Sequence, residues 1–323
     1  MKTFPERKVK IKEADGTERV FTIRPYKYGD EAGIVDCIRE EYGETYFKQD
    51  FYEAEKVKEF ADSGHIHFFV AESEDFIAGM VILTVFSDRE DYIEPASHIL
   101  RKKYRGTVLG ASLGHYVLDM GKSLRPCSLF VHAVTFHRST QILCEKYSEG
   151  VMILPVAKTD AGIIYLPEEV AEFGRRIYGQ LKVPVEIKTA QEVVKAMETM
   201  EEEPQLQIHR DSLQRTVLVR VLSSGRTIAD KMQELIDSFK GENEWTIQVT
   251  LSTSSPAVFY EYDQLRRLGF FFTGLKPLCG NEEQMYMQWL GDVHLYMEDY
   301  ALTDSFQVLR EQIGEYYKNR NSF

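Results

Sequence analysis

Apolar and polar residues follow two periods along the first half of this 323-residue chain. Short runs rich in β-branched and aromatic residues predict strands, while apolar residues spaced three and four apart predict helices. Asp30 precedes the first helical run and is expected to cap it. The pattern predicts strands at residues 20–24, 67–71, 76–85, 96–100, 128–135, 151–154 and 162–166, and helices after Asp30 and at 52–62, 111–123 and 139–147.

The second half repeats part of this pattern. It predicts strands at residues 216–222, 246–251, 270–275 and 285–290, and helices at 227–239, from 256 onward and at 305–317. A chain of this length suits two domains. The character of the sequence changes after Pro167, and we expect the two domains at residues 1–181 and 182–323.

The composition is that of a soluble globular protein, with 43% hydrophobic and 28% charged residues. A net charge of −12 argues against nucleic acid or an anionic membrane as the main partner. No apolar run reaches the ~18 residues of a membrane span. The four cysteines lack the spacing of a metal site, so we expect no metal, reduced thiols and a cytoplasmic protein.

A basic stretch that contains glycine, residues 101–111, lies between a predicted strand and a predicted helix. Lys102, Lys103 and Arg105 concentrate positive charge there in an otherwise acidic chain. Glycine lets the backbone approach a ligand closely, and the first N–H groups of a helix favour an anion. The stretch therefore predicts a phosphate-binding turn, and the alternative is an ordinary helix start.

The same stretch resembles the acyl-CoA pyrophosphate loop of the GNAT superfamily of N-acetyltransferases, whose motif is Arg/Gln-x-x-Gly-x-Gly/Ala. Arg105 fills the first position and Gly110 the last, while Val108 replaces the central glycine. The predicted element order of the first half, β-α-α-β-β-β-α-β-α-β-β, also resembles this fold. Further likenesses are found at residues 69–72, 77–79, 135–141 and 265–270. The resemblance implies a GNAT fold in the first half, an α+β arrangement of a mixed, mostly antiparallel sheet flanked by helices. It also implies a diverged, partial GNAT-like unit in the second half.

The resemblance implies acetyl-CoA as the cofactor, used as a co-substrate. The peptide N–H groups of the turn would hold its pyrophosphate, and the backbone of the preceding strand would pair with its pantetheine arm. The residues implied are His98, Ile99, Leu100, Arg105, Gly106, Thr107, Val108, Leu109, Gly110 and Ala111. The corresponding turn of the second half, after Ser223, has one glycine and is not expected to bind CoA.

Acetyl transfer needs one group that deprotonates the amine and one that reprotonates the thiolate. Glu94 and His98 are four residues apart, so both should face one side if the strand predicted at 96–100 extends to Glu94, and either is a candidate base. An ordered water is the alternative. Pro95 leaves open the alternative that Glu94 lies in a loop. The resemblance puts Cys144 where the family has its tyrosine acid, and His137 is a second candidate. A structural role is the alternative for both.

Aromatic and acidic residues at 42–46 predict an amine-binding region, since the corresponding loop borders the acceptor site in the family. The residues expected to contact the acceptor are Tyr42, Glu44 and Tyr46, with core packing as the alternative. The resemblance implies an acyltransferase that moves an acetyl group to a primary amine of a small molecule or peptide by direct attack. The alternative is a catalytically inactive module that senses CoA or an amine. The sequence leaves open that the protein forms a homodimer.

Overall fold

The computed structural model describes residues 4–13, 15–74, 76–86, 89–126, 128–133, 135, 138–148, 153–156, 160–189, 198–212, 214–239, 245–277 and 282–321. For residues 86, 89–92, 144, 146–148 and 153–155 it describes the backbone alone. Contacts divide the chain into two compact units, Met1–His132 and Ala133–Phe323. Each unit is described separately.

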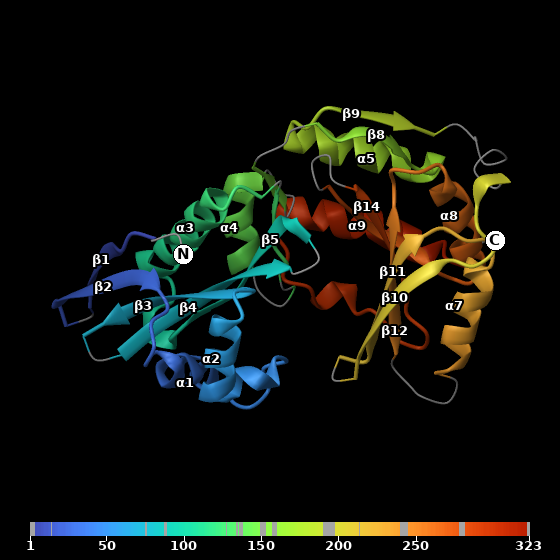
Figure 1. Cartoon of the computed structure of the whole chain (residues 1–323). Helices are drawn as coiled ribbons and strands as arrows, with labels where there is room; N and C mark the ends of the chain where they lie inside the picture. Colours follow the sequence, from blue (N-terminus) through green and yellow to red (C-terminus); the bar gives the residue numbers. More distant parts are fainter. Residues whose placement is uncertain are drawn as a thin grey trace. The chain divides into compact units, whose positions relative to one another are not determined.

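The first unit is built on a mixed sheet (Figure 1). Its strands lie side by side in chain order: β1 (Arg7–Lys12), β2 (Glu18–Pro25), β3 (Ile66–Ser73), β4 (Phe76–Phe86), β5 (Arg89–Leu100) and β6 (Ser128–Phe130). Neighbours from β1 to β5 are antiparallel, and β6 runs parallel to β5. The helices are α1 (Glu31–Tyr42), α2 (Ala54–Asp62) and α3 (Val108–Ser123), with 3₁₀ helices η1 (Gln49–Tyr52) and η2 (Lys102–Tyr104). The predicted order β-α-α-β-β-β-α-β is confirmed from β2 to β6, and β1 is additional.

Helices cover both faces of this sheet (Figure 1). Strand alternation sends Phe68 and Ile82 to the face where α1 contributes Ile34, and the three belong to one buried cluster. The opposite face packs against α3, where the rings of Phe69 and Tyr116 lie 5.7 Å apart. The first unit therefore has three layers, with the sheet in the middle.

Asp30 stands directly before α1, as predicted, but its carboxylate makes no cap hydrogen bond to the helix. It accepts two hydrogen bonds from the Arg24 guanidinium, at 2.6 and 2.9 Å, and one from the Lys27 N–H at 2.8 Å. Glu72 accepts from Nε of the same arginine at 2.5 Å. Arg24 and Asp30 are 4% and 6% exposed. The expected helix cap is instead a buried ion pair that ties β2 to the start of α1.

The second unit has a sheet with the strand order β10-β11-β12-β14-β13. The strands are β10 (Gln205–Asp211), β11 (Thr216–Ser223), β12 (Thr246–Ser252), β13 (Phe271–Lys276) and β14 (Gln284–Trp289). β11 and β12 are parallel, and the other neighbouring pairs are antiparallel. Three helices accompany them: α7 (Ile228–Asp237), α8 (Ala257–Arg267) and α9 (Asp304–Lys318). These elements lie close to the predicted ranges, and β10 is additional.

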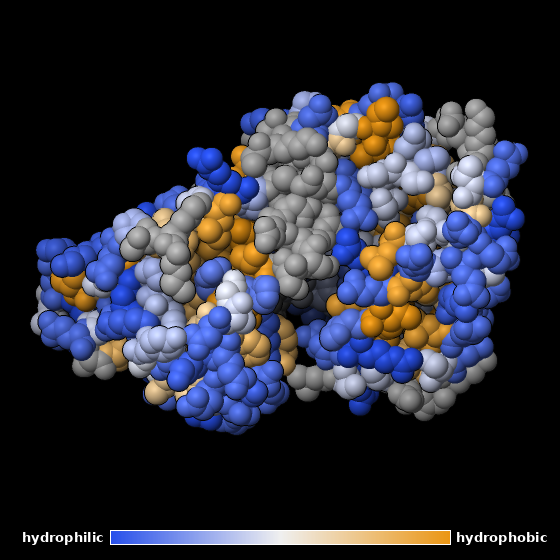
Figure 2. Space-filling model, in the orientation of Figure 1, coloured by the Kyte–Doolittle hydropathy of each residue, from blue (hydrophilic) through white to orange (hydrophobic). Residues whose placement is uncertain are grey.

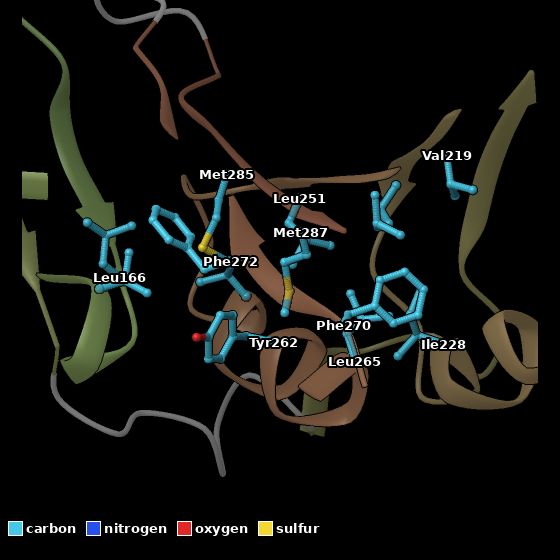
Figure 3. Close-up of a cluster of buried hydrophobic side chains, with 14 of the residues drawn as sticks. Leu166, Val219, Ile228, Leu251, Tyr262, Leu265, Phe270, Phe272, Met285 and Met287 are labelled. Atoms are coloured by element: carbon cyan, nitrogen blue, oxygen red, sulfur yellow. The ribbon is translucent and has the colours of Figure 1, made fainter. Parts of the chain in front are cut away.

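Apolar side chains from this sheet and its helices form the core of the second unit (Figure 3). Val219 of β11, Met287 of β14 and Leu265 of α8 are all fully or almost fully buried in it. Alternation along β11 leaves Leu218 and Leu222 exposed on the opposite face of that strand. Figure 2 shows apolar surface over β10 and β11.

Residues before the predicted domain boundary share this second core. They form β8 (Gly162–Tyr165) and α5 (Glu168–Leu181), and α4 (Ser139–Ser148) and β7 (Ile153–Pro155) precede them in the chain. β9 (Val185–Lys188), just after that boundary, pairs with β8 in parallel. Phe173 and Ile177 of α5 lie in the same buried cluster as β11 and β12. The division at residues 132 and 133 therefore falls well before the expected one at 181 and 182, because α5 packs with the C-terminal strands.

Both units combine helices with mixed, mostly antiparallel sheets, which confirms the predicted α+β class. Among the described residues, no helix is both long and apolar enough to cross a membrane. The likeness of the second unit to a partial GNAT fold stays a prediction.

Candidate functional site

The basic turn predicted from the sequence joins β5 to α3. Gly106 has a φ of +73°, where a side chain would be strained, so the turn requires glycine. Thr107 caps the helix by accepting the Leu109 N–H at 3.3 Å, and α3 begins at Val108, earlier than the predicted residue 111. The other first N–H groups of α3 have no acceptors within the helix. Such groups favour an anion, and the binding of a phosphate at this turn stays a prediction.

Gly110 lets the first turn of α3 lie directly on the end of β5. An added Cβ at Gly110 would come within 2.7 Å of Cδ1 of Leu100. His98, also on β5, makes a hydrogen bond to the backbone of Gly110. Burial lowers the pKa of His98 to about 4, and the hydrogen bond only partly offsets this. His98 is therefore neutral at pH 7 and a weak base, and its buried Nε2 has no hydrogen-bond partner in the part of the chain that the structure describes.

The basic side chains of the turn are paired with glutamates from other elements. Arg101 binds Glu40 at 2.7 Å, Lys103 binds Glu13 at 2.6 Å, and Arg105 pairs with Glu41. Burial opposes ionisation of Glu40, but hydrogen bonds from Arg101 and the Lys102 N–H bring its pKa below the usual value. An incoming anion must therefore compete with these carboxylates for the positive charge.

A β-bulge at Ser97 overturns the expectation that Glu94 and His98 face one side. Ser97 has a φ of +52°, and the pairing with β4 shifts there. Ala96 pairs with Ile82 and Ile99 with Met80, so three steps along β5 match two along β4. The bulge inverts the alternation of side chains after it. Glu94 therefore lies on the α1–α2 face, whereas His98 lies on the face of α3.

The parallel strand β6 stays beside β5 for only a short distance. Among the described residues, it pairs with Tyr92 and Ile93 of β5 and with nothing further along that strand. Outside the bulge, residues 94–96 and 99–100 of β5 remain paired with β4 on their other side. Among the described residues, β6 therefore leaves the backbone edge of Ile99 and Leu100 next to the turn unpaired, and pairing of this edge with a ligand arm stays a prediction.

Glu94 belongs to a cluster of polar and aromatic side chains on the α1–α2 face. Its Oε1 lies 2.6 Å from Nδ1 of His132, and the side chains are 17% and 72% exposed. Tyr46 OH lies 2.6 Å from Oγ of Ser97. Lys48 Nζ lies 5.4 Å from the centre of the Phe51 ring. Burial lowers the pKa of Lys48, and the nearby charge of Glu94 only partly offsets this.

The predicted acceptor residues separate in the structure. The rings of Tyr42 and Tyr46 are 4.7 Å apart, and Tyr46 is buried beside the cluster. Glu44 instead forms an ion pair with Arg39 at 3.3 Å and is 73% exposed. Sequence reasoning missed Lys48, Ser97 and His132. The aromatic neighbours of Lys48 were the one available signal.

The two candidate acids, His137 and Cys144, cannot be placed in this cluster. His137 lies outside the described residues, as does the side chain of Cys144. The backbone of Cys144 is in α4, which belongs to the second unit. Gln141 of α4 hydrogen-bonds to Ala301 O at 3.1 Å and accepts the Thr303 N–H at 3.0 Å. α4 thus packs with the C-terminal segment.

The turn between β11 and α7 is occupied by the chain itself. The Arg226 N–H donates to Glu201 O at 3.1 Å, and the Thr227 N–H donates to Glu202 O at 3.0 Å. A Cβ added to Gly225 would lie 2.1 Å from N of Pro204. These two backbone N–H groups before α7 are therefore engaged within the chain. That this turn binds no CoA stays a prediction.

No protein-family model matches the sequence, and no curated protein matches it. Solved structures similar to part of the chain include a GNAT-family acetyltransferase from Staphylococcus aureus Mu50, 15% identical over 40% of this chain and 81% of its own, with a TM-score of 0.32. The Escherichia coli GNAT-family N-acetyltransferase YhbS, solved with CoA, is 17% identical over 43% of this chain and 82% of its own, with a TM-score of 0.33. The PaiA N-acetyltransferase from Thermoplasma acidophilum, solved with coenzyme A, is 17% identical over 40% of this chain and 87% of its own, with a TM-score of 0.31.

Proposed function

We propose that the first unit is an N-acetyltransferase that uses acetyl-CoA to acetylate a primary amine. One observation carries the proposal: two features meet at the end of β5. The N-terminus of α3 offers backbone N–H groups to a phosphate, and beside it β5 has an edge that β6 leaves unpaired in the described residues. A pyrophosphate joined to an extended, amide-bearing arm fits such a pair of features.

The residues at this place fit CoA in part. The N–H groups of residues 106–111 would hold the pyrophosphate, and the backbone edge of residues 98–100 would pair with the amides of the arm. Nε2 of His98 is a buried polar atom without a described partner. Acetyl-CoA would supply the activated thioester. The basic side chains of the turn would add charge only after leaving their glutamates.

Glu94 and His132 would act on the amine as one unit. Glu94 Oε1 would accept the Nδ1–H of His132, which fixes the tautomer and leaves Nε2 as the atom that takes a proton. Removal of its proton makes the acceptor amine a nucleophile. This proposal moves the base from Glu94 to His132, with Glu94 as the positioning carboxylate. His137, Cys144 or water as the acid stays a prediction.

The acceptor would be a small molecule or a peptide with a primary amine. Tyr42 and Tyr46 lie on the same face as Glu94 and would contact the apolar part of the acceptor. Glu44, exposed and paired with Arg39, would lie at the edge of this region.

A catalytically inactive module that binds CoA or an amine is the second candidate. The ion pairs of the basic turn favour it, as does the 61% exposed Val108 at the central glycine position, since both weaken an anion site. Release of free thiol from acetyl-CoA, followed across a panel of amines, separates the candidates. Amine-dependent release supports the enzyme, and binding without release supports the module.

Val108→Asp should weaken CoA binding by about tenfold or more, because a carboxylate would stand at the phosphate end of α3. The same change should leave the melting temperature equal or higher, since an acidic residue in the first turn stabilises a helix by about 0.3–1 kcal/mol. Isothermal titration with CoA and thermal unfolding measure the two effects.

Val108→Asn is the matched control for this variant, because it has nearly the same shape without the charge. It should bind CoA within about threefold of the wild type. Equal affinity of the aspartate and asparagine variants would place the phosphate elsewhere. If the wild type binds no acetyl-CoA at millimolar concentration, the proposed function is wrong.

A further inference from the structure

The second unit contains a cavity at the carboxyl ends of the parallel strands β11 and β12. Its volume is about 540 Å³, which is within the range of small-molecule sites. Ligands of open α/β sheets often bind at the carboxyl ends of parallel strands. The lining residues include the ends of both strands, the turn that follows β11, the start of α8 and the segment at 199–201.

A buried, incompletely bonded carboxyl group lines this cavity. Glu261 of α8 is 2% exposed, and its Oε1 has no hydrogen-bond partner within the described parts of the chain. Its carboxyl group accepts a hydrogen bond from Ser224, which also lines the cavity. Burial raises the pKa of Glu261 to about 7, and the hydrogen bond from Ser224 only partly offsets this. A buried carboxylate without a counter-ion is costly, so the site favours a partner that supplies positive charge.

The other described lining residues are poorly suited to an anion. They include Glu201 and Glu282, and none of them is lysine, arginine or histidine. Glu282 binds Arg220 at 3.0 Å. Serine hydroxyls supply further hydrogen-bonding atoms: Ser223, Ser224, Ser252 and Ser255.

Backbone N–H groups near the starts of α7 and α8 are bound within the chain. Segment 201–202 takes the N–H groups of Arg226 and Thr227 before α7. Oγ of Ser255 accepts the Ala257 N–H at 3.2 Å, and O of Ser255 accepts the Val258 N–H at 3.2 Å. The N–H groups of Arg226, Thr227, Ala257 and Val258 are thereby engaged within the chain, and the charged side chains among the described lining residues are glutamates.

We propose that this cavity is a second ligand site, which binds a small organic cation through a primary ammonium group with Glu261 as its counter-ion. The ammonium group would donate to Oε1 of Glu261, and the serine hydroxyls would bind further polar groups of the ligand. The site lies entirely in the second unit and is independent of acetyl-CoA.

Thermal unfolding at pH 7.5 with n-butylammonium chloride tests the site. At tens of millimolar n-butylammonium chloride, the wild type should melt on the order of 2 °C or more higher than in sodium chloride at the same concentration. Tetramethylammonium, which has no N–H donor, should give a clearly smaller gain. Glu261→Gln should abolish the difference between the two cations.

Glu234→Gln is the matched control, because it removes the same charge from an exposed position of α7. It should keep the wild-type response. The proposal is overturned if Glu261→Gln responds like the wild type, or if the two cations stabilise the wild type equally up to 50 mM. Acetyl-CoA titration of Glu261→Gln should match the wild type, so failure of this site and failure of the proposed acetyltransferase are distinguishable.

Without ligand, Glu261→Gln should melt at a higher temperature than the wild type at pH 8 and at the same temperature near pH 4. The folded-state pKa of Glu261, about 7, lies above the usual 4.5. Ionisation therefore costs the folded wild type stability as the pH rises from 4.5 through 7, and glutamine cannot ionise. Glu201 and Glu282, the latter paired with Arg220, are the other charged groups at the cavity and are unchanged. The expected difference is on the order of 5 °C, and no difference at pH 8 would contradict a buried, unpaired carboxylate.

Discussion

Asp30→Ala should lower the free energy of unfolding by about 3–5 kcal/mol, because it leaves the buried Arg24 with an uncompensated charge. Arg24 is 4% exposed, and two of its hydrogen bonds, at 2.6 and 2.9 Å, end on Asp30. Burial opposes the charged form of Arg24, and Asp30 and Glu72 together raise its pKa above the usual value. Glu72 is partly exposed and can compensate only part of the loss. Urea unfolding followed by circular dichroism measures the effect.

Asp36→Ala is the control for this variant. Asp36 is an exposed acidic residue of the same helix, so its loss should change stability by no more than about 0.5 kcal/mol. Asp30→Asn should fall between the two, because the amide keeps the shape and a hydrogen-bond acceptor but not the charge. Equal stability of Asp30→Ala and Asp36→Ala would show that the pair contributes little.

This pair also shows which parts of the fold the sequence could predict. The elements around it followed from local periodicity, which needs only residues close in the chain. The role of Asp30 did not, because an aspartate before a helix has the same local signature whether it caps the helix or binds an arginine. Its partner Arg24 lies on the preceding strand and Glu72 on β3, and only the pairing of β2 with β3 brings them together.

In the candidate site, too, local features could be predicted from the sequence and the others could not. The turn at residues 101–111 was predicted because its glycines and its place between a strand and a helix are local. The bulge at Ser97 has no comparable signal, since the residue with positive φ is not glycine. One extra residue reverses every later side chain of a strand, so Glu94 and His98 could not be assigned to faces from their spacing.

The domain boundary could not be read from α5 for a related reason. Its apolar stripe shows that one face of the helix is buried, but a stripe does not identify the sheet that covers it. Phe173 and Ile177 would have suited either core, and long-range packing places them with β11 and β12. The position of residues 201–204 against the turn between β11 and α7 could not be predicted either. Their contacts at this turn are made by the backbone and have no side-chain signature in the sequence.

Glu94→Gln should lower kcat for amine acetylation by about 10²- to 10⁴-fold while leaving the Kd for acetyl-CoA nearly unchanged. Glutamine retains the shape of the side chain, but its neutral amide no longer enforces the Nδ1–H tautomer of His132 or stabilises the charged imidazole. Initial rates of thiol release, with binding measured separately, test this expectation. Glu59→Gln, an exposed glutamate of α2, is the matched control and should keep the wild-type rate.

The strongest test of the pair is the combination of Glu94→Gln with His132→Gln. The two side chains meet at 2.6 Å, and groups that act as one unit lose most of their effect when either is removed. The double variant should therefore react at most about threefold more slowly than the slower of the two single variants. If the fold-losses in rate of the two single variants multiply in the double variant, Glu94 and His132 act independently. If His132→Gln is fully active, the base is Glu94 or water.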